Sequence, residues 1–452
     1  MEIINSTLWS GLFLPLFLLC GLILALRCRF LPLRHFGGAL GMAFKKQDGS
    51  GTVTQLQAVC TALASTVGTG NIIGTAQAIA MGGQGAVFWL WVSAIPAMLI
   101  KYAEIFLGLR YRQLVGGEYV GGTMYYIEHG LGRRFKALAV VYALFAAVSV
   151  LCMGTMAQIG GAVGALEQAA AELCLAEKAR RAFRPLLGVA LAVILFFVLS
   201  GGARGVGRVS ALLVPLMSGF FILFTLVIII CHAQRLPSVL RGIIQDAFSL
   251  RAVSGAAGGL TLKHALHWGV RRGAFSNEAG LGFAAMAHAA AGGEPAKQGL
   301  WGVFEVFADT VVICTLTALA ILVSGVEIPW GQLVGAHLLQ SAAATVFGHS
   351  LSAVFLALSL FLFGFTTVIG SSLYGLYCAR YLFGDGSDGV YRLLICLCAV
   401  AGCLMTTSSV WTAADTVNAL MALPNLIAVL CLSALIGRES REYFANKIAA
   451  KY

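Results

Sequence analysis

Ser65-Thr66-Val67-Gly68-Thr69-Gly70-Asn71 interrupts an apolar run that otherwise extends over residues 57–81. Such a run is long enough to cross a bilayer as a helix, for which about 20 apolar residues suffice. Glycine costs about 1 kcal/mol in a helix interior and lets the backbone unwind. Because unwound backbone at membrane depth is tolerated only beside a cavity or inside protein, the stretch predicts a broken membrane helix at an internal site.

A second stretch of the same kind lies within residues 264–291 and reads Gly273-Ala274-Phe275-Ser276-Asn277-Glu278-Ala279-Gly280-Leu281-Gly282. Where a helix breaks, its second half begins with unpaired N–H groups and a positive dipole end, which attract a carboxylate. The carbonyl groups freed at the end of the first half attract a cation. Close packing between helices is the alternative reading of either stretch, since small residues also serve that purpose.

The composition places both stretches in an integral membrane protein. Of 452 residues, 59% are hydrophobic and 11% charged, with a mean hydropathy of +0.88, whereas soluble proteins are about one-quarter charged. The apolar runs are too long for barrel strands, so we expect an all-α protein. A hydropathy window predicts about eleven transmembrane helices, at 8–27, 57–81, 85–109, 135–160, 184–200, 209–232, 264–291, 299–323, 350–382, 390–407 and 413–436.

The net charge of +11 reflects Lys and Arg residues in the short loops between spans, so we assign it to membrane topology and not to nucleic acid. The loops 324–349 and 407–414 contain neither residue, whereas the C-terminal tail is basic. This pattern predicts a multi-pass protein of the cell (inner) membrane, with the N-terminus outside and the C-terminus cytoplasmic. The basic cluster at 178–184 would lie outside and is an exception to the rule.

The two predicted breaks fall in the first helix of spans 2–6 and the first helix of spans 7–11. Five helices inserted one way and five the other form an inverted repeat, and paired interrupted helices point to its binding site. The first span is then an extra N-terminal helix. We expect an extra helix and cytoplasmic connector (1–56), a first five-helix repeat (57–232), an extracellular connector (233–262), a second repeat (263–437) and a cytoplasmic tail (438–452).

Several motifs occur in a characteristic order: Gly68-Thr69-Gly70-Asn71-Ile72, Lys101-Tyr102-Ala103-Glu104, Gly273 to Gly280, Asp309-Thr310, Thr366-Thr367-Val368-Ile369-Gly370 and Met421-Ala422-Leu423-Pro424-Asn425. The ordered set resembles the alanine or glycine:cation symporter family, the sodium:alanine symporters of the LeuT-like superfamily. The resemblance implies a LeuT-like 5+5 fold. It also implies import of a small neutral amino acid by Na⁺ symport through alternating access, with alanine or glycine favoured over larger substrates such as serine or glutamine.

Two alternatives remain open at this point. The symport could be coupled to protons, or the chain could be an amino acid sensor that uses the same scaffold without transport. In the first reading Na⁺ is the coupling ion and not a prosthetic group.

The resemblance also implies the residues of the substrate site. Backbone amides around Thr69 and Gly70 would hold the substrate carboxylate, and Gln158 would face the same cavity, although an interhelical hydrogen bond would also explain Gln158. Phe275 and its neighbours would line the side-chain pocket. The complete predicted set adds Asn71, Ser276, Asn277, Gly280 and Ser371. Ser371 stands where the family pattern has Trp, which leaves the substrate's size open.

The resemblance places the Na⁺ site between the hydroxyls of Thr366 and Thr367 and backbone carbonyls at about Ala64 and Val67. Hydroxyls deep in an apolar helix offer hard oxygen ligands. The alternative is that both threonines bond back to carbonyls of their own helix.

Four carboxylates, Glu104, Glu278, Asp309 and Asp415, lie within or at the edge of the predicted spans, and intramembrane acids are functional candidates by default. Lys101 precedes Glu104 by three positions, which predicts an ion pair on one helix face. Glu278 lies inside the second break, where we expect it to hold the unwound segment in shape; carrying a coupling proton is the alternative.

The chain lacks the residue patterns that enzymes and zinc sites require. Its 12 cysteines form no C-x-x-C pair with a matching His or Cys set, and His264 and His267 lack an evident third ligand. We therefore expect no enzymatic activity. The expected partners are the amino acid substrate and the lipid bilayer, with neither nucleic acid nor an obligatory protein partner.

Overall fold

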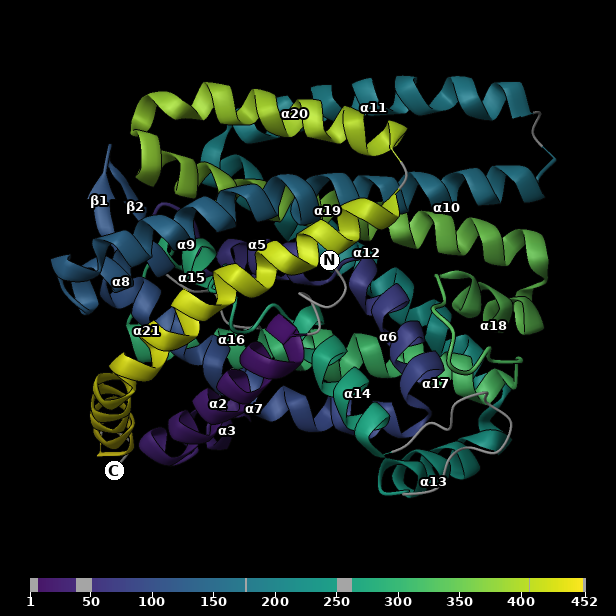
Figure 1. Cartoon of the computed structure of the whole chain (residues 1–452), viewed down its shortest axis with the longest axis horizontal. Helices are drawn as coiled ribbons and strands as arrows, with labels where there is room; N and C mark the ends of the chain where they lie inside the picture. The colour runs from purple at the N-terminus through teal and green to yellow at the C-terminus, as the bar shows by residue number, and fades with distance from the viewer. Residues whose placement is uncertain (1–6, 38–50, 175–176, 250–261, 406, 450–452) are drawn as a thin grey trace.

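The computed structural model describes residues 7–37, 51–174, 177–249, 262–405 and 407–449, and it is helical almost throughout (Figure 1). Parts of both predicted connectors (38–50 and 250–261) and the two chain ends lie outside the described residues. One antiparallel hairpin, β1 (Gln113–Val115) and β2 (Glu118–Val120), joins two helices. The prediction of an all-α membrane protein is confirmed.

The helices of the N-terminal half include the first interrupted element, α5 and α6. They are η1 (Thr7–Phe13), α2 (Leu14–Cys28), α3 (Leu31–Arg34), α5 (Gln55–Thr66), α6 (Thr69–Gly82), α7 (Gly85–Arg110), α8 (Thr123–Gly130), η2 (Arg133–Phe135), α9 (Lys136–Ser149), η3 (Val150–Ala157), α10 (Gln158–Glu172), α11 (Glu177–Ser200), α12 (Gly202–Cys231), η4 (Ala233–Arg235) and α13 (Leu236–Ala247).

The helices of the C-terminal half include the second interrupted element. They are α14 (Leu262–Ser276), α15 (Ala284–Ala289), α16 (Pro295–Val306), η5 (Phe307–Cys314), α17 (Thr315–Ser324), α18 (His337–Phe347), α19 (His349–Phe383), η6 (Asp385–Ser387), α20 (Asp388–Leu404) and α21 (Thr407–Ala449).

Among the described residues, nine helices are long and apolar enough to cross a membrane, and a tenth span arises if α5 and α6 count as one broken span. These two helices are bent by 44° relative to one another. The sequence predicted about eleven spans. The span at 264–291 is not among the counted helices, because α14 carries Lys263, Arg271 and Arg272 and ends at Ser276.

The long helices α10, α11, α19 and α20 run side by side along the longest axis of the molecule (Figure 1). The hairpin and α8 lie at one end of this axis, and α13 and α18 lie at the other. The broken helices α5–α6 and α14–α15 occupy the interior, whereas α11 and α12 expose many apolar side chains on the outside. Lipid-facing apolar side chains are expected of a membrane protein.

Lys101 of α7 lies in the interior of the fold, with 1% of its side chain exposed. Its Nζ donates to the Asn277 carbonyl at 2.6 Å and lies 3.7 Å from Oε2 of Glu305 on α16. The predicted ion pair with Glu104 is wrong, because Glu104 turns to backbone amides of the second break. Unwound backbone offers both carbonyl and amide groups. A carbonyl of the second break accepts a hydrogen bond from the Lys101 ammonium, and amides of the same break donate to the Glu104 carboxylate.

Replacing Lys101 by Met should lower the melting temperature of the detergent-solubilised protein strongly. Oε2 of Glu305 would lose the Lys101 ammonium, although Oε1 keeps its hydrogen bond to Nε2 of His288, and removing one partner of a buried ion pair costs about 3–5 kcal/mol. The double variant Lys101→Met/Glu305→Gln should regain part of the loss. Lys136→Met removes a pair that is 66% exposed at the lysine and should change little. A double variant that melts as low as the single one contradicts the charge argument.

Candidate substrate and cation site

The first break is two residues long. α5 ends at Thr66, Val67 leaves the helical region with ψ 88°, and Gly68 is extended, with φ −130° and ψ −164°, before α6 begins at Thr69. A β-carbon on Gly68 would lie 2.7 Å from Oγ1 of Thr367, so the close approach of α19 at this point requires glycine. The sequence-based prediction of a broken helix here is therefore correct in position.

The break redirects two backbone amides to side chains. The Gly68 amide donates to Oδ1 of Asn71 at 2.9 Å, and the Thr69 amide donates to Oε1 of Gln158 at 3.4 Å. In a continuous helix these amides would bond to carbonyl groups four residues earlier, at Ala64 and Ser65. Carbonyls at the end of α5 are thereby released from their helical partners.

Gln158, the first residue of α10, contacts the first break at Thr69. Its Oε1 also accepts a hydrogen bond from Oγ1 of Thr69 at 2.9 Å, and only 4% of the residue is exposed. The structure therefore brings together Thr69 and Gln158 as expected. It does so through a direct interhelical hydrogen bond, which was the alternative reading of Gln158.

The second break is longer than the first and runs from the end of α14 at Ser276 to the start of α15 at Ala284. Glu278, Gly280 and Gly282 all have positive φ, at 55°, 91° and 79°. A β-carbon on Gly282 would lie 2.0 Å from Oγ1 of Thr123, so both conformation and space demand glycine there. Conformations of this kind persist only where surrounding groups hold them.

Glu104 on α7 holds the second break in place. Its Oε1 accepts hydrogen bonds from the amides of Gly280 at 2.9 Å and Gly282 at 3.1 Å. Nδ2 of Asn425 on α21 bonds to the same Oε1 at 2.6 Å and to the Gly280 carbonyl at 2.8 Å. An intramembrane carboxylate thus supplies the acceptor that helical carbonyls would otherwise provide.

Glu278 ties the second break to the first. Its Oε2 accepts a hydrogen bond from Oγ of Ser65, on α5, at 2.8 Å. The side chain is part-buried, and its bond to the opposite half of the chain fits the expectation that it holds the unwound segment in shape.

Asp309 on η5 provides a second tie. Oδ1 accepts from Nδ2 of Asn71 at 2.6 Å, and Oδ2 accepts from Oγ of Ser276 at 2.8 Å and from Oγ1 of Thr310 at 3.0 Å. All four residues are fully or almost fully buried. One carboxylate therefore joins α6 and the end of α14. The sequence marked Asp309 only as an intramembrane acid.

A small cavity of about 20 Å³ lies beside the breaks, which is space for about one water molecule. It is lined by Ser149, Val150, Met153, Gly154, Gln158, Glu278, Phe283, Thr367, Ser371 and Asn418. Helices from both halves of the chain thus contribute side chains to one partly polar cavity. An amino acid is larger than this space, so its binding there requires the surrounding helices to move.

Some predicted substrate residues lie away from this cavity. Asn71 and Ser276 bond to Asp309, and Nδ2 of Asn277 donates to Oγ1 of Thr310 at 3.0 Å. Gly70 and Phe275 lie together on another side of the first break, where a β-carbon on Gly70 would be 3.8 Å from Cε1 of Phe275.

The residues predicted to bind the cation likewise differ in whether they line the cavity. Oγ1 of Thr366 bonds to carbonyls of its own helix and lies 3.1 Å from Sδ of Met217 on α12. Oγ1 of Thr367 likewise donates to the Phe363 carbonyl of its own helix at 2.9 Å, so both threonines bond back to α19, as the alternative reading expected. Thr367 in addition faces Gly68 and lines the cavity. Gly370 packs against the end of α5, because a β-carbon there would lie 3.3 Å from Cβ of Ala64.

Sequence reasoning did not single out Ser149 and Asn418, which share a hydrogen bond and line the cavity. Asn418 is a polar residue in an apolar span and could have been found by that signal. Ser371 donates to the carbonyls of Gly154 at 3.2 Å and Thr367 at 2.7 Å. The missing indole at this position is thus replaced by packing against a glycine of η3.

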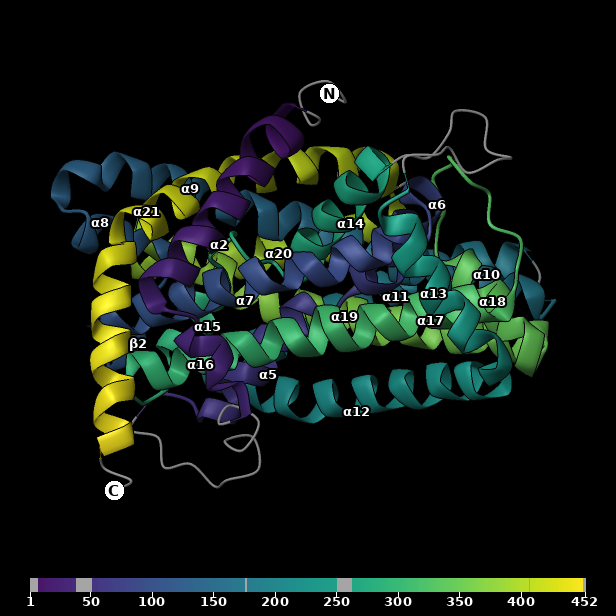
Figure 2. The same ribbon diagram turned by 90° about the horizontal axis from the view of Figure 1, so that it is seen from below.

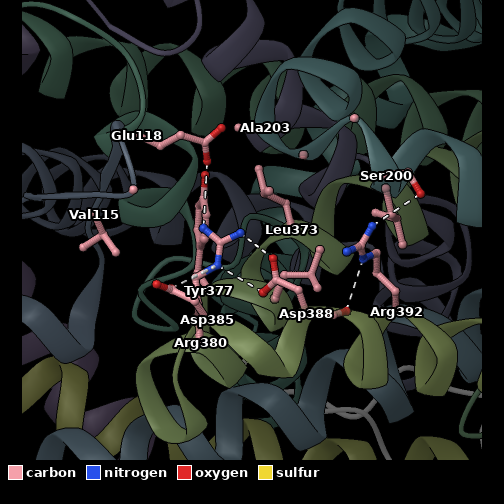
Figure 3. Close-up of a pocket in the computed structure, with 15 residues that line it drawn as sticks. Val115, Glu118, Ser200, Ala203, Leu373, Tyr377, Arg380, Asp385, Asp388 and Arg392 are labelled. Atoms are coloured by element: carbon pink, nitrogen blue, oxygen red, sulfur yellow. Dashed lines mark hydrogen bonds and ion pairs between the residues drawn. The ribbon is translucent and has the colours of Figure 1, made fainter.

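A second cavity, of about 350 Å³, lies between the hairpin and the end of α19 (Figure 3). Arg380 crosses it, with hydrogen bonds from Nε at 3.0 Å and Nη2 at 2.5 Å to the carboxylate of Asp388. Its Nη1 also lies 3.9 Å from Glu118 of β2. This ionic cluster fastens the hairpin to α19 and α20, and it contains none of the predicted site residues.

The family model described as "Sodium:alanine symporter family" matches residues 1–452. The chain belongs to the sodium:alanine symporter family. One member, the sodium/alanine symporter AgcS of Methanococcus maripaludis, is 37% identical over 453 residues, covering 97% of this chain and 96% of that protein. Another, named "Probable sodium/glutamine symporter GlnT", of Bacillus subtilis, is 34% identical over 456 residues, covering 99% and 91%. Like them, this family member is a multi-pass membrane transporter and not an enzyme.

Among solved structures, the manganese transporter of Eremococcus coleocola, in complex with an aromatic bis-isothiourea substituted compound, aligns with a TM-score of 0.51 and 16% identity. The alignment covers 86% of this chain and 79% of that one. At this identity the likeness concerns the fold alone.

Gly68→Ala should lower the melting temperature. Alanine adopts the backbone angles of Gly68, but its β-carbon would press on Thr367, and overpacking costs about 1–3 kcal/mol. Gly164→Ala in α10, where a β-carbon meets no atom within 4 Å, should raise stability by about 0.5–1 kcal/mol. Thermal unfolding in one detergent compares the two. Equal shifts in both variants would mean that α19 does not approach the first break this closely.

Proposed function

We propose that this family member is a secondary active transporter that imports a small neutral amino acid together with Na⁺ by alternating access. Alanine and glycine are the preferred candidates. The observation that carries the proposal is the pair of broken helices, tied to each other by Glu278 beside a small polar cavity and by Asp309 away from it. Two such breaks supply amides for a carboxylate and carbonyls for a cation without any unpaired ionised side chain.

The substrate site extends from the first break towards Phe275. The amides at Thr69 and Gly70 begin α6, where the dipole favours the substrate carboxylate. Gln158 contacts Thr69 and is placed to exchange that hydrogen bond for one to the substrate. Phe275 lies beside Gly70 and would contact the substrate's side chain. The side chains of Asn71, Ser276 and Asn277 and the backbone of Gly280 would complete the site from the two breaks.

The Na⁺ site lies between α5 and α19. Its ligands are the carbonyls of Ala64 and Val67 and the hydroxyls of Thr366 and Thr367. Support comes from the diverted Gly68 amide, which releases a carbonyl at the end of α5, and from the close packing of Gly370 there. Oxygen ligands of this kind suit a hard cation. Thr366 would have to rotate from Met217 to join the site.

Substrate size depends on Ser371. Relatives are named for alanine and for glutamine, so the scaffold accommodates substrates that differ by several heavy atoms. A serine in place of an indole leaves space for the larger of them once the cavity opens. Serine and glutamine are therefore included in the substrate range.

In this proposal the chain folds as two inverted five-helix repeats, at 57–232 and 263–437, and one extra helix precedes them. The N-terminus lies outside and the C-terminus in the cytoplasm of the cell membrane. The basic residues near the hairpin and in α21 support this orientation under the positive-inside rule.

Proton coupling is the second candidate, and it is favoured by one observation: Glu278 lines the small cavity beside the breaks. Intramembrane acids beside a substrate cavity are common proton carriers. Uptake driven by a proton gradient in sodium-free buffer would support this candidate.

Purified protein in proteoliposomes should accumulate labelled alanine when an inward Na⁺ gradient is imposed. Thr367→Val should raise the Na⁺ concentration for half-maximal uptake about tenfold or more, because a polar contact to a charged group contributes about 1.5–3 kcal/mol. Thr317→Val is the matched control: this buried threonine bonds to the Ile313 carbonyl of its own helix, as Thr367 bonds to Phe363, but it is not among the residues that line the cavity. A Thr367→Val protein with the wild-type Na⁺ response removes the cation site.

A further inference from the structure

The extra N-terminal helix reaches the second break. Its first segment, η1, precedes α2, which lies against α7 and α21 (Figure 1, Figure 2). Trp9 and Phe13 on η1 are 2% and 1% exposed, although membrane-facing leucines of α2 such as Leu22 are 58% exposed. One face of this helix is thus buried as deeply as the core.

The two aromatic side chains contact residues of the second break. The rings of Trp9 and Phe275 have centroids 6.0 Å apart, within the range of favourable aromatic pairs. Cε2 of Phe13 lies 3.3 Å from where a β-carbon on Gly280 would be. Because Phe275 also packs beside Gly70, an apolar contact runs from the extra helix through Phe275 to the first break.

Trp9 is held in this position by polar contacts to α14 and α21. Its Nε1 donates to the Asp415 carbonyl at 3.0 Å. The Arg271 guanidinium lies 5.6 Å from the Trp9 ring centroid, and its Nη2 lies 3.3 Å from Oδ2 of Asp415. The indole therefore covers an ion pair between the two helices, and this contact fixes the ring against Phe275.

We infer that Trp9 is a positioning residue for the substrate's side-chain pocket. The inference rests on the proposed function, which places the pocket at Phe275. Trp9 prevents the Phe275 ring from turning away from Gly70, so a residue outside the ten-helix core sets how large a side chain the pocket admits. Without the indole, Phe275 gains room to tilt outward, small substrates lose contact and larger ones fit.

Transport by the full-length protein in proteoliposomes tests this. Trp9→Ala should raise the KM for alanine about five- to tenfold, as expected for loss of one aromatic contact, while the maximal rate per folded protein changes less than about twofold. Inhibition of alanine uptake by leucine and methionine should strengthen relative to inhibition by glycine. Trp9→Phe retains a ring against Phe275 and should restore most of the wild-type selectivity.

Leu24→Ala is the matched control, because Leu24 is fully buried on the same helix and lies four turns beyond Trp9. It should lower the melting temperature and leave the KM and the inhibitor order unchanged. If Trp9→Ala yields no folded protein, Trp9→Leu keeps apolar volume without a flat ring and should show the same change in selectivity.

The possible results distinguish a failure of the proposed function from a failure of the role of Trp9. Wild-type protein that takes up no amino acid overturns the proposed function. Wild-type uptake together with folded Trp9 variants of unchanged KM and inhibitor order overturns the role of Trp9 alone. A change in selectivity that Trp9→Phe reverses and Leu24→Ala does not reproduce supports it.

Discussion

The structure depends on one constraint: backbone that leaves a helix inside a membrane must find hydrogen-bond partners within the protein. In the second break the partner is the carboxylate of Glu104, which accepts the amides of Gly280 and Gly282. Asn425 and Lys101 bind the freed carbonyls of Gly280 and Asn277. Buried polar side chains that look costly in a membrane helix are thereby explained as the supports of an unwound segment.

Buried polar side chains also join the two breaks to each other. Asp309 holds Asn71 of α6 and Ser276 of α14, and Glu278, which lies in the second break, holds Ser65 of α5. Broken helices connected in this way are expected to move together and not independently. Such coupled motion is what alternating access around a fixed site requires, because opening to one side must close the other.

The sequence located both breaks, because glycine and small polar residues in an apolar run are a local signal. Through the family resemblance it also assigned Thr69, Gln158 and Phe275 to one substrate site; Thr69 and Gln158 do contact each other, whereas Phe275 lies beside Gly70, away from the cavity. It assigned Lys101 the wrong partner, since helical spacing could not reveal that distant unwound backbone competes for the ammonium and for Glu104. The contact of Thr366 with Met217 and that of the N-terminal helix with Phe275 likewise depend on how the helices pack. Hydrophobic periodicity in the sequence does not predict such packing.

The central claim is that the two breaks form one site shared by an amino acid and Na⁺. Calorimetric titration of alanine into the detergent-solubilised protein, in Na⁺ and in choline at equal ionic strength, tests it without requiring transport. Adjacent sites at the first break and helices linked by Glu278 and Asp309 predict an alanine affinity about tenfold or more higher in Na⁺, with a reciprocal rise of Na⁺ affinity in alanine. Equal alanine affinity in both salts would contradict the account.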